Sequence, residues 1–206
     1  LHKEYRRQRQ MCIRDRPYTD VPHIDFNLSH DGDWVVMAFS RTHRVGVDVM
    51  QVALPHFEES SASFCRTMSS SMSRSEREWV AQGASEADVL SRLYDVWTYK
   101  EALTKNMGLG LGYDFARIDL RFGRDVRLAM DGRAVDTYRF RELALPCGAS
   151  SRAPGSRVAI ALGPRDAWEA PMSKQAVPAQ QAMDEGWLRM WTYDAWLDYA
   201  RAMSGV

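Results

Sequence analysis

The stretch Asp95–Lys105, with the sequence DVWTYKEALTK, decides how the rest of the chain is interpreted. Its spacing predicts a helix on which Trp97, Glu101 and Lys105 follow one another at intervals of four residues, so that all three lie on one face. An acid and a base one turn apart, beside a large aromatic ring, are suited to hold a phosphate group and a metal ion. The same acid and base are also compatible with an ordinary solvated ion pair, which stabilises a helix by only about 0.2–0.5 kcal/mol.

Two segments nearer the N-terminus carry further polar groups among strand-forming residues. Phe26–His30 has the sequence FNLSH, and Val45–Val49 has the sequence VGVDV. An unpaired carboxylate inside an apolar strand is costly to bury, so Asp48 needs a cation, a metal ion or a set of hydrogen bonds. Alternatively, Asp48 lies at an exposed sheet edge and faces water. His30, taken alone, fits a structural or surface histidine better than a functional one.

The polar groups of these three segments form one candidate site. Two separated carboxylates, Asp48 and Glu101, can share a magnesium ion, a hard cation that binds a few carboxylates together with substrate phosphate oxygens. Lys105 and His30 could then hold or protonate phosphate oxygens. The sequence has no Walker loop, GxGxxG or HExxH pattern that would indicate another cofactor. We therefore expect Asp48 and Glu101 to converge within reach of one divalent cation.

The composition is that of a soluble globular protein. The chain has 206 residues, of which 45% are hydrophobic and 26% charged, enough for one domain or one and a half. Lys and Arg balance Asp and Glu at 27 each, so no global basic field favours nucleic acid as a partner. The cysteines Cys12, Cys65 and Cys147 form no CxxC pair, which argues against a disulfide framework or a zinc site. A monomer in a reducing, cytoplasmic location fits best.

The first residues are expected to be a basic arm or an incomplete start. Residues 1–16 are rich in Arg and Gln, which fits a frayed, solvated end better than an arm that meets phosphate. Because the first residue is Leu rather than Met, we expect the true start to be missing. Whether a targeting signal precedes these residues is therefore left open. The longest apolar runs have the length of strands and are too short to span a bilayer, so no membrane association is expected.

Strand patterns occur on both sides of the central helix and predict an antiparallel sheet packed on helices, an α+β protein. Three strands that form an antiparallel meander are expected at 24–28, 34–39 and 45–49. Four further strands are expected at 118–122, 126–130, 138–143 and 157–162. The pairs Asp31-Gly32 and Asp131-Gly132 are typical of tight hairpin turns.

Helix signals fill the middle of the chain. The stretch 54–73 is ambiguous, with a short helix possible. Ser73–Glu76 is a capping box that opens a helix ending at Gly83. Ser85 opens the helix that contains the central stretch and that ends at Gly108 and Gly110.

The C-terminal segment, residues 166–206, is expected to be a linker followed by one amphipathic helix. Pro171–Pro178 has the composition of a linker, and Ala179–Met203 is predicted to be helical. One face of this helix carries Trp187, Trp191, Ala195 and Tyr199. Such a stripe indicates packing onto the domain, or onto missing chain, rather than ligand binding.

Together, the three motifs resemble those of the 4′-phosphopantetheinyl transferase superfamily, most closely its long, surfactin-type branch. That family shows F-N-x-S-H, G-x-D and W-x-x-K-E-x-x-x-K in this order and at about this spacing, which matches Phe26–His30, Gly46–Asp48 and Trp97–Lys105. Met107–Gly112 followed by Asp114-Phe115 resembles the stretch after the helix in the eukaryotic-like members.

The resemblance covers about Arg16 to Leu162 and implies the fold of that family for residues 17–165. The long branch is a pseudo-dimer of two similar α+β halves, and this chain resembles mainly the second half. We therefore expect most of the first half to be missing.

The resemblance also implies a reaction, the transfer of 4′-phosphopantetheine from coenzyme A to a serine of an acyl, peptidyl, aryl or aminoadipate-reductase carrier protein, with release of 3′,5′-ADP. By position, Asp48 and Glu101 would bind Mg²⁺, and Glu101 would also act as the general base on the carrier serine. The catalytic residues would be Glu101, Lys105 and His30. The residues that contact coenzyme A would be Arg16, Ser29, His30, Lys100 and Lys105.

The sequence departs from the family pattern in two ways, and these leave alternative functions open. Met50 stands where many members have a further acid, although eukaryotic-like members share an apolar residue there, so a water is expected to complete the metal shell. Because most of the first half is expected to be missing, a second hypothesis is a truncated coenzyme A-binding module without turnover. A third is a soluble α+β domain whose ion pair and histidine are structural.

Overall fold

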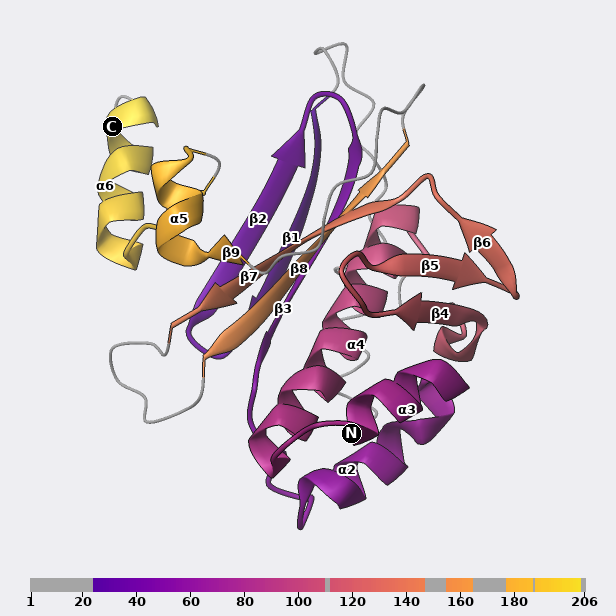
Figure 1. Ribbon diagram of the computed structural model, residues 1–206. Coiled ribbons are helices and arrows are strands. Elements are labelled where there is room, and N and C mark those ends of the chain that lie inside the picture. The colour runs from indigo at the N-terminus through magenta and orange to yellow at the C-terminus, as the bar shows by residue number, and fades with distance from the viewer. Residues whose placement is uncertain (1–23, 110–111, 147–154, 165–176, 187, 205–206) are drawn as a thin grey trace.

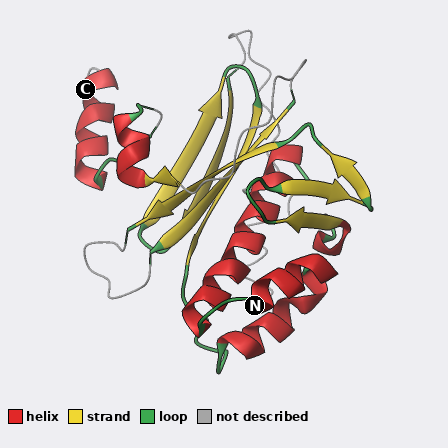
Figure 2. Ribbon diagram, viewed as in Figure 1, coloured by secondary structure: helices red, strands yellow, loops and turns green. Residues whose placement is uncertain are grey.

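A long central helix, α4, packs across a mixed sheet, with a separate β-hairpin, a smaller sheet and further helices around it (Figures 1 and 2). The structure is a computed structural model, and it describes residues 24–109, 112–146, 155–164, 177–186 and 188–204. The α+β class expected from the sequence is confirmed. Residues 1–16, including Arg16, lie outside the described residues.

The first two strands form a hairpin of their own. β1 (Asp25–Asp31) pairs antiparallel with β2 (Trp34–Ser40) through a tight turn in which Gly32 has a φ of +54°. One face of β2 is turned towards the core, whereas the other face is exposed. The exposed face consists of Val35, Met37 and Phe39.

The main sheet has the order β3-β8-β7-β9, formed by β3 (Arg44–Gln51), β8 (Ser156–Gly163), β7 (Arg139–Leu145) and β9 (Val177–Pro178). β3 pairs antiparallel with β8, from more than one hundred residues further along the chain, and not with β2. The prediction that the third strand joins the first two in one antiparallel meander is therefore wrong. β9 lies parallel to β7 within the stretch predicted to be a linker, while residues 171–176 of that stretch lie outside the described residues.

The helices begin and end close to where their capping signals predict. They are α2 (Ser61–Met68), η1 (Ser69–Ser71), α3 (Arg74–Ala81) and α4 (Glu86–Met107). The Ser73–Glu76 capping box forms as expected, with each side chain bonded to the other residue's backbone. α4 ends at Gly108, whose φ of +73° is the left-handed conformation that glycine tolerates best.

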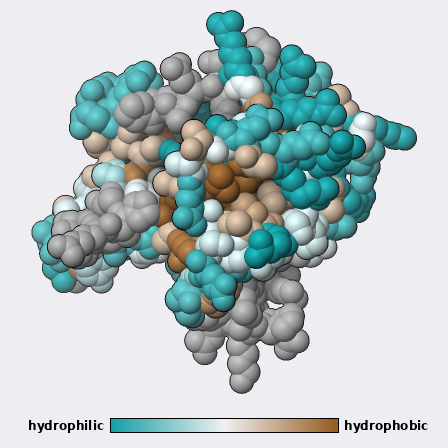
Figure 3. Space-filling model, turned by 60° about the horizontal axis from the view of Figure 1, so that its bottom comes forward, coloured by the Kyte–Doolittle hydropathy of each residue, from teal (hydrophilic) through white to brown (hydrophobic). Residues whose placement is uncertain are grey.

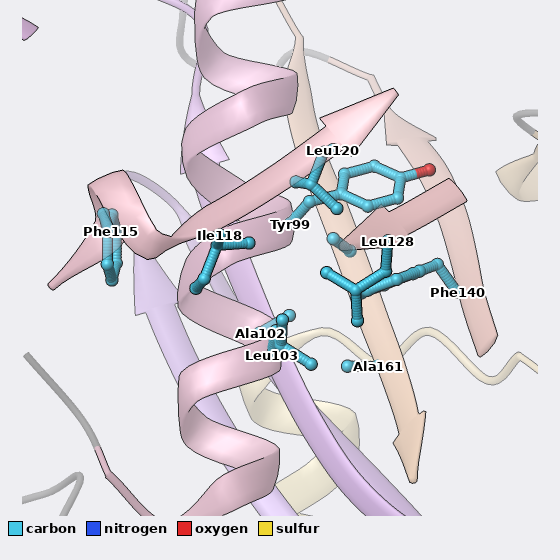
Figure 4. Packing of buried hydrophobic residues seen from close by; sticks show 10 residues of the cluster. Tyr99, Ala102, Leu103, Phe115, Ile118, Leu120, Leu128, Phe140 and Ala161 are labelled. Carbon is cyan, nitrogen blue, oxygen red and sulfur yellow. The ribbon is translucent and has the colours of Figure 1, made fainter. Parts of the chain in front are cut away.

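A three-stranded sheet follows α4 and covers one side of it. It consists of β4 (Ile118–Arg121), β5 (Arg127–Met130) and β6 (Arg133–Val135), preceded by η3 (Phe115–Arg117). β6 was not predicted. Figure 4 shows how Tyr99 and Leu103 of α4 meet Ile118 and Leu120 of β4 in the larger apolar core.

The C-terminal segment does not form one helix. α5 (Ala179–Asp184) ends at a turn in which Gly186 has a φ of +77°, and α6 (Tyr193–Ser204) follows. The prediction of a continuous helix from 179 to 203 is therefore wrong. Ala179 and Ala182 pack with Val47 and Val49 in a second apolar core on the far side of the main sheet from α4.

The surface is mixed in character. The view from the lower end of the molecule shows hydrophilic side chains around a central hydrophobic area (Figure 3). Among the described residues, every helix is too short or too polar to cross a membrane.

Candidate active site

Asp48, in the middle of β3, meets Lys105, in the last turn of α4. The ammonium group of Lys105 donates to Asp48 Oδ1 at 2.7 Å and to the carbonyl oxygen of Val47 at 3.2 Å. Ser29 of β1 completes the cluster, because its hydroxyl donates to Asp48 Oδ1 at 2.9 Å and lies 3.0 Å from Lys105 Nζ. The three motifs of the sequence therefore meet at one place.

The sequence of β1 explains how Ser29 reaches this place. Alternate side chains of β1 accept hydrogen bonds from alternate backbone N–H groups of β3, in place of a backbone ladder. The pairs are Asp25 with Val45, Asn27 with Val47, Ser29 with Val49, and Asp31 with Gln51. Because strand side chains alternate between two faces, every second residue of DFNLSHD is polar and turned to β3. The register fixes Ser29 beside Asp48.

Gly46 allows α4 to lie close to β3. A Cβ atom at this position would overlap the carbonyl oxygen of Ala102 and the backbone nitrogen of Asn106. The side chain of Asn106 adds a direct link, donating to the carbonyl oxygens of Arg44 at 2.7 Å and Ala161 at 2.9 Å. The lysine and the acid on α4 can reach Asp48 because the helix backbone touches the strand.

Glu101 lies one turn before Lys105 on the same side of α4 and is only 7% exposed. Burial, together with the negative charge of Asp48, raises the pKa of Glu101 to about 8, while Lys105 opposes the shift. Burial also raises the pKa of Asp48, against the effect of Lys105 and Ser29. The charge of Asp48 thus acts on Glu101, and the cluster contains two buried acids for one lysine.

The donor set fits a small divalent cation. Asp48 Oδ2 is buried and has no hydrogen-bond partner among the described residues. An orphaned carboxylate oxygen beside a second buried acid is suited to Mg²⁺, which takes one or two carboxylates and completes its shell with water and phosphate. Within the described part of the chain, no group of three or more His, Cys, Asp or Glu side chains is placed to hold a metal. Among the described residues the cluster therefore offers two acidic ligands, with Met50 adding no third acid.

Two of the described residues predicted for the site do not join this cluster. His30 is exposed and lies opposite Val35 on the other face of the hairpin from Ser29. Neighbours in a strand point to opposite faces, so Ser29 and His30 cannot both face Asp48. Lys100 is completely buried on another side of α4, where it pairs with Glu76. Arg16 lies outside the described residues.

Trp97, expected to flank the site, is partly buried and packs against the core, where its ring lies 5.2 Å from that of Phe115. Two groups that support the site were missed from the sequence. The alternating polar residues of β1 carry a signal, a period of two, that could have indicated their role. The pairing of Glu76 with Lys100 carries none, because the two residues are 24 positions apart.

The fold and the site define an α+β protein with an acid–acid–lysine cluster at the junction of a strand and a helix, a donor set suited to a divalent cation and a phosphate group. The chain belongs to the 4′-phosphopantetheinyl transferase superfamily, whose family model matches residues 44–159. This range includes Asp48, Glu101 and Lys105.

Individual relatives carry the same description. A 4′-phosphopantetheinyl transferase of Paxillus involutus is 36% identical over 140 residues, which is 62% of this chain and 53% of the relative. The human L-aminoadipate-semialdehyde dehydrogenase-phosphopantetheinyl transferase is 28% identical over 131 residues, 59% of this chain and 42% of the relative. The 4′-phosphopantetheinyl transferase Sfp of Bacillus subtilis is 24% identical over 112 residues, 54% of this chain and 46% of the relative. The chain thus spans about half the length of the curated relatives it matches.

Proposed function

We propose that the protein transfers 4′-phosphopantetheine from coenzyme A to a serine hydroxyl of a carrier protein in a Mg²⁺-dependent reaction. The observation that carries the proposal is the convergence of Asp48, Glu101 and Lys105, with Ser29 beside them. The membership of the family and the names of the relatives support the same reaction.

In this reaction the serine oxygen forms a bond to the phosphorus that carries pantetheine, and the bond from that phosphorus to the bridging oxygen breaks. The products are the modified carrier and 3′,5′-ADP. Glu101 takes the proton of the serine hydroxyl, directly or through a water. A pKa of about 8 suits a general base, because efficient bases have pKa values near the operating pH.

Lys105 stabilises the charge that develops on the departing phosphate. Its ammonium group now donates to oxygen atoms of Asp48, Ser29 and Val47, and a substrate phosphate would compete for the same donors. Asp48 and Glu101 would hold Mg²⁺, which when bound neutralises charge on the pyrophosphate. Ser29 would contact the nucleotide phosphates. His30, from outside the cluster, and Arg16 remain proposed contacts to coenzyme A.

The proposal is tested by incubating labelled coenzyme A with an apo carrier protein, with and without Mg²⁺. A panel of acyl, peptidyl, aryl and aminoadipate-reductase carrier domains covers the proposed partners. We expect transfer by the wild-type chain that requires Mg²⁺, and a loss of at least about 100-fold in Glu101→Gln. Glu78→Gln is the matched control, because Glu78 is an exposed acid on α3.

A second outcome would favour a different function. Because the chain spans about half the length of its relatives, a coenzyme A-binding module without turnover is the specific alternative. Binding of coenzyme A by calorimetry without transfer to any carrier would support that module. Absence of both binding and transfer would overturn the proposed function.

A further inference from the structure

The side of α4 that faces away from Asp48 carries a second buried ion pair. Lys100 Nζ donates to Glu76 Oε2 at 2.6 Å and to the carbonyl oxygens of Ser71 and Phe115, each at 2.9 Å. An ammonium group has three protons to donate, so these contacts use its full capacity. Lys100 is completely buried and has no donor left for a phosphate group.

The carboxylate of Glu76 is equally occupied. Oε1 accepts the backbone N–H of Leu120 at 2.8 Å, and Oε2 accepts that of Ser73 at 2.7 Å in addition to Lys100. Through these bonds one carboxylate joins the first turn of α3, strand β4 and helix α4. Glu76 is also completely buried, so the network is shielded from solvent.

Lys100 directly precedes Glu101, and successive residues of a helix point about 100° apart. Any turn of α4 about its axis that moved Lys100 would therefore move Glu101 and Lys105 as well. The apolar core on α4, made by residues such as Tyr99 and Leu103, gives a non-directional attraction. A network of short, directional hydrogen bonds specifies the rotation of the helix more sharply than apolar contact does.

Resting on the proposed function, we propose that the Glu76–Lys100 pair is a positioning device, which sets the rotation of α4 so that Glu101 and Lys105 face Asp48. Lys100 is then a positioning residue and not a ligand of coenzyme A, and Glu76 is its partner. Buried ion pairs contribute little net stability compared with apolar replacements of similar volume. In line with this, burial lowers the pKa of Lys100 and raises that of Glu76.

The decisive variant removes the pair without leaving a buried charge. Glu76→Leu combined with Lys100→Met should melt near the wild-type temperature, because apolar side chains of similar volume replace the pair. It should transfer phosphopantetheine about 100-fold more slowly, since a misplacement of about 1 Å has effects of this size. KM for coenzyme A should stay near the wild-type value, because no substrate contact is lost. Arg74→Ala, which removes an exposed ion pair of α3, is the control and should leave kcat unchanged.

Glu76→Gln provides a second variant that keeps the shape of the side chain, and it should lower kcat in the same direction with KM unchanged. A stable double variant with wild-type kcat would overturn the proposal. So would a raised KM for coenzyme A in Lys100→Met together with unchanged kinetics in Glu76→Gln, since that result would make Lys100 a ligand.

A readout that does not need turnover separates this proposal from the proposed function. In protein labelled with ¹⁵N-lysine, the ammonium signal of Lys105 reports its contact with Asp48. We expect this signal to shift in the double variant and to stay unchanged in Arg74→Ala. If the wild type transfers nothing, the proposed function fails. The Lys105 ammonium signal then tests on its own whether the Glu76–Lys100 pair positions α4. An unchanged signal in the double variant would overturn it.

Discussion

Two lysines five positions apart on α4 end in very different surroundings. Lys100 and its partner Glu76 have side chains that are 1% and 0% exposed, and both carboxylate oxygens of Glu76 are hydrogen-bonded. Lys105 and its partner Asp48 are 10% and 6% exposed, and Asp48 Oδ2 has no partner among the described residues. Near the second pair lies a further buried acid, Glu101, whereas the further acids that act on Lys100, Asp114 and Asp119, are not buried.

The difference fits a structural role for the first ion pair and supports the functional role proposed for the second. A satisfied network holds segments in place and offers nothing to a ligand. A buried acid with an unused oxygen, next to another acid, is an unfavourable arrangement for the protein alone and calls for an explanation such as an ion. The motif lysines cannot be told apart in the sequence WTYKEALTK, and only their partners distinguish them.

The largest expected effect tests the structural pair. Lys100→Met leaves the carboxylate of Glu76 buried without its cation and should lower the free energy of unfolding by about 3–5 kcal/mol. Lys105→Met should cost less, because water reaches the Lys105 side chain more readily and Asp48 keeps its bond from Ser29. Urea unfolding followed by circular dichroism measures both losses. Equal losses in the two variants would contradict the distinction between the pairs.

The stability of the pair proposed to be functional should depend on pH. The pKa of Glu101 is about 8 in the folded protein and 4.5 ordinarily. Between these values the folded state holds a proton that the unfolded state has lost, so the free energy of unfolding falls as pH rises. Glu101→Gln should flatten this fall by about 1 kcal/mol per pH unit. Urea unfolding at several pH values between these limits provides the measurement.

Two controls accompany this pH series. Glu78→Gln, on the exposed surface of α3, should keep the wild-type slope. Addition of Mg²⁺ should make the wild-type slope shallower, because metal binding favours ionised carboxylates, and should leave Glu101→Gln unchanged. Identical slopes in wild type and Glu101→Gln would show that Glu101 is not held in a buried site next to Asp48.

Local signals in the sequence predicted much of the framework. The capping box at Ser73–Glu76, the Gly108 terminus of α4 and both hairpin turns were located correctly because each depends on neighbouring residues. The convergence of Asp48 with Lys105 followed from the resemblance to a family and from the cost of burying an acid inside an apolar strand. The helix patterns placed Glu101 and Lys105 on one face.

What the sequence could not supply depends on distant parts of the chain. The pairing of β3 with β8 and the ion pair of Glu76 with Lys100 join segments that no local pattern connects. The position of His30 outside the cluster could have been anticipated, because a period of two already implies that His30 and Ser29 face opposite sides of β1. Gly186 signals the end of a helix, but the spacing of the aromatic residues was given more weight, and a continuous helix was predicted.

A smaller effect is expected from the close packing of β3 against α4 at Gly46. Gly46→Ala would place a methyl group against the backbone of Ala102 and Asn106, so α4 must move away from β3. We expect a loss of about 1–3 kcal/mol, typical of overpacking, and loss of the ¹⁵N signature of the Lys105–Asp48 contact. Gly123→Ala is the matched control, because only one atom lies within 4 Å of a Cβ there, at 3.8 Å. An unchanged Lys105 signal in Gly46→Ala would mean that close approach is not required.

The smallest effect is expected for the ion pair of Arg74 with Glu78, which resembles the two buried pairs in distance but not in burial. Arg74 Nε lies 2.8 Å from Glu78 Oε1, nearly as close as Lys105 to Asp48 at 2.7 Å, but the two side chains are 88% and 58% exposed. In water the attraction is screened and the side chains lose rotamer freedom, so Arg74→Ala should leave the urea midpoint unchanged within error. Raising the salt concentration should likewise not alter the difference between variant and wild type. A clear loss of stability in Arg74→Ala would show that distance, and not burial, ranks the ion pairs of this protein, and the contrast between Lys100 and Lys105 would then need another cause.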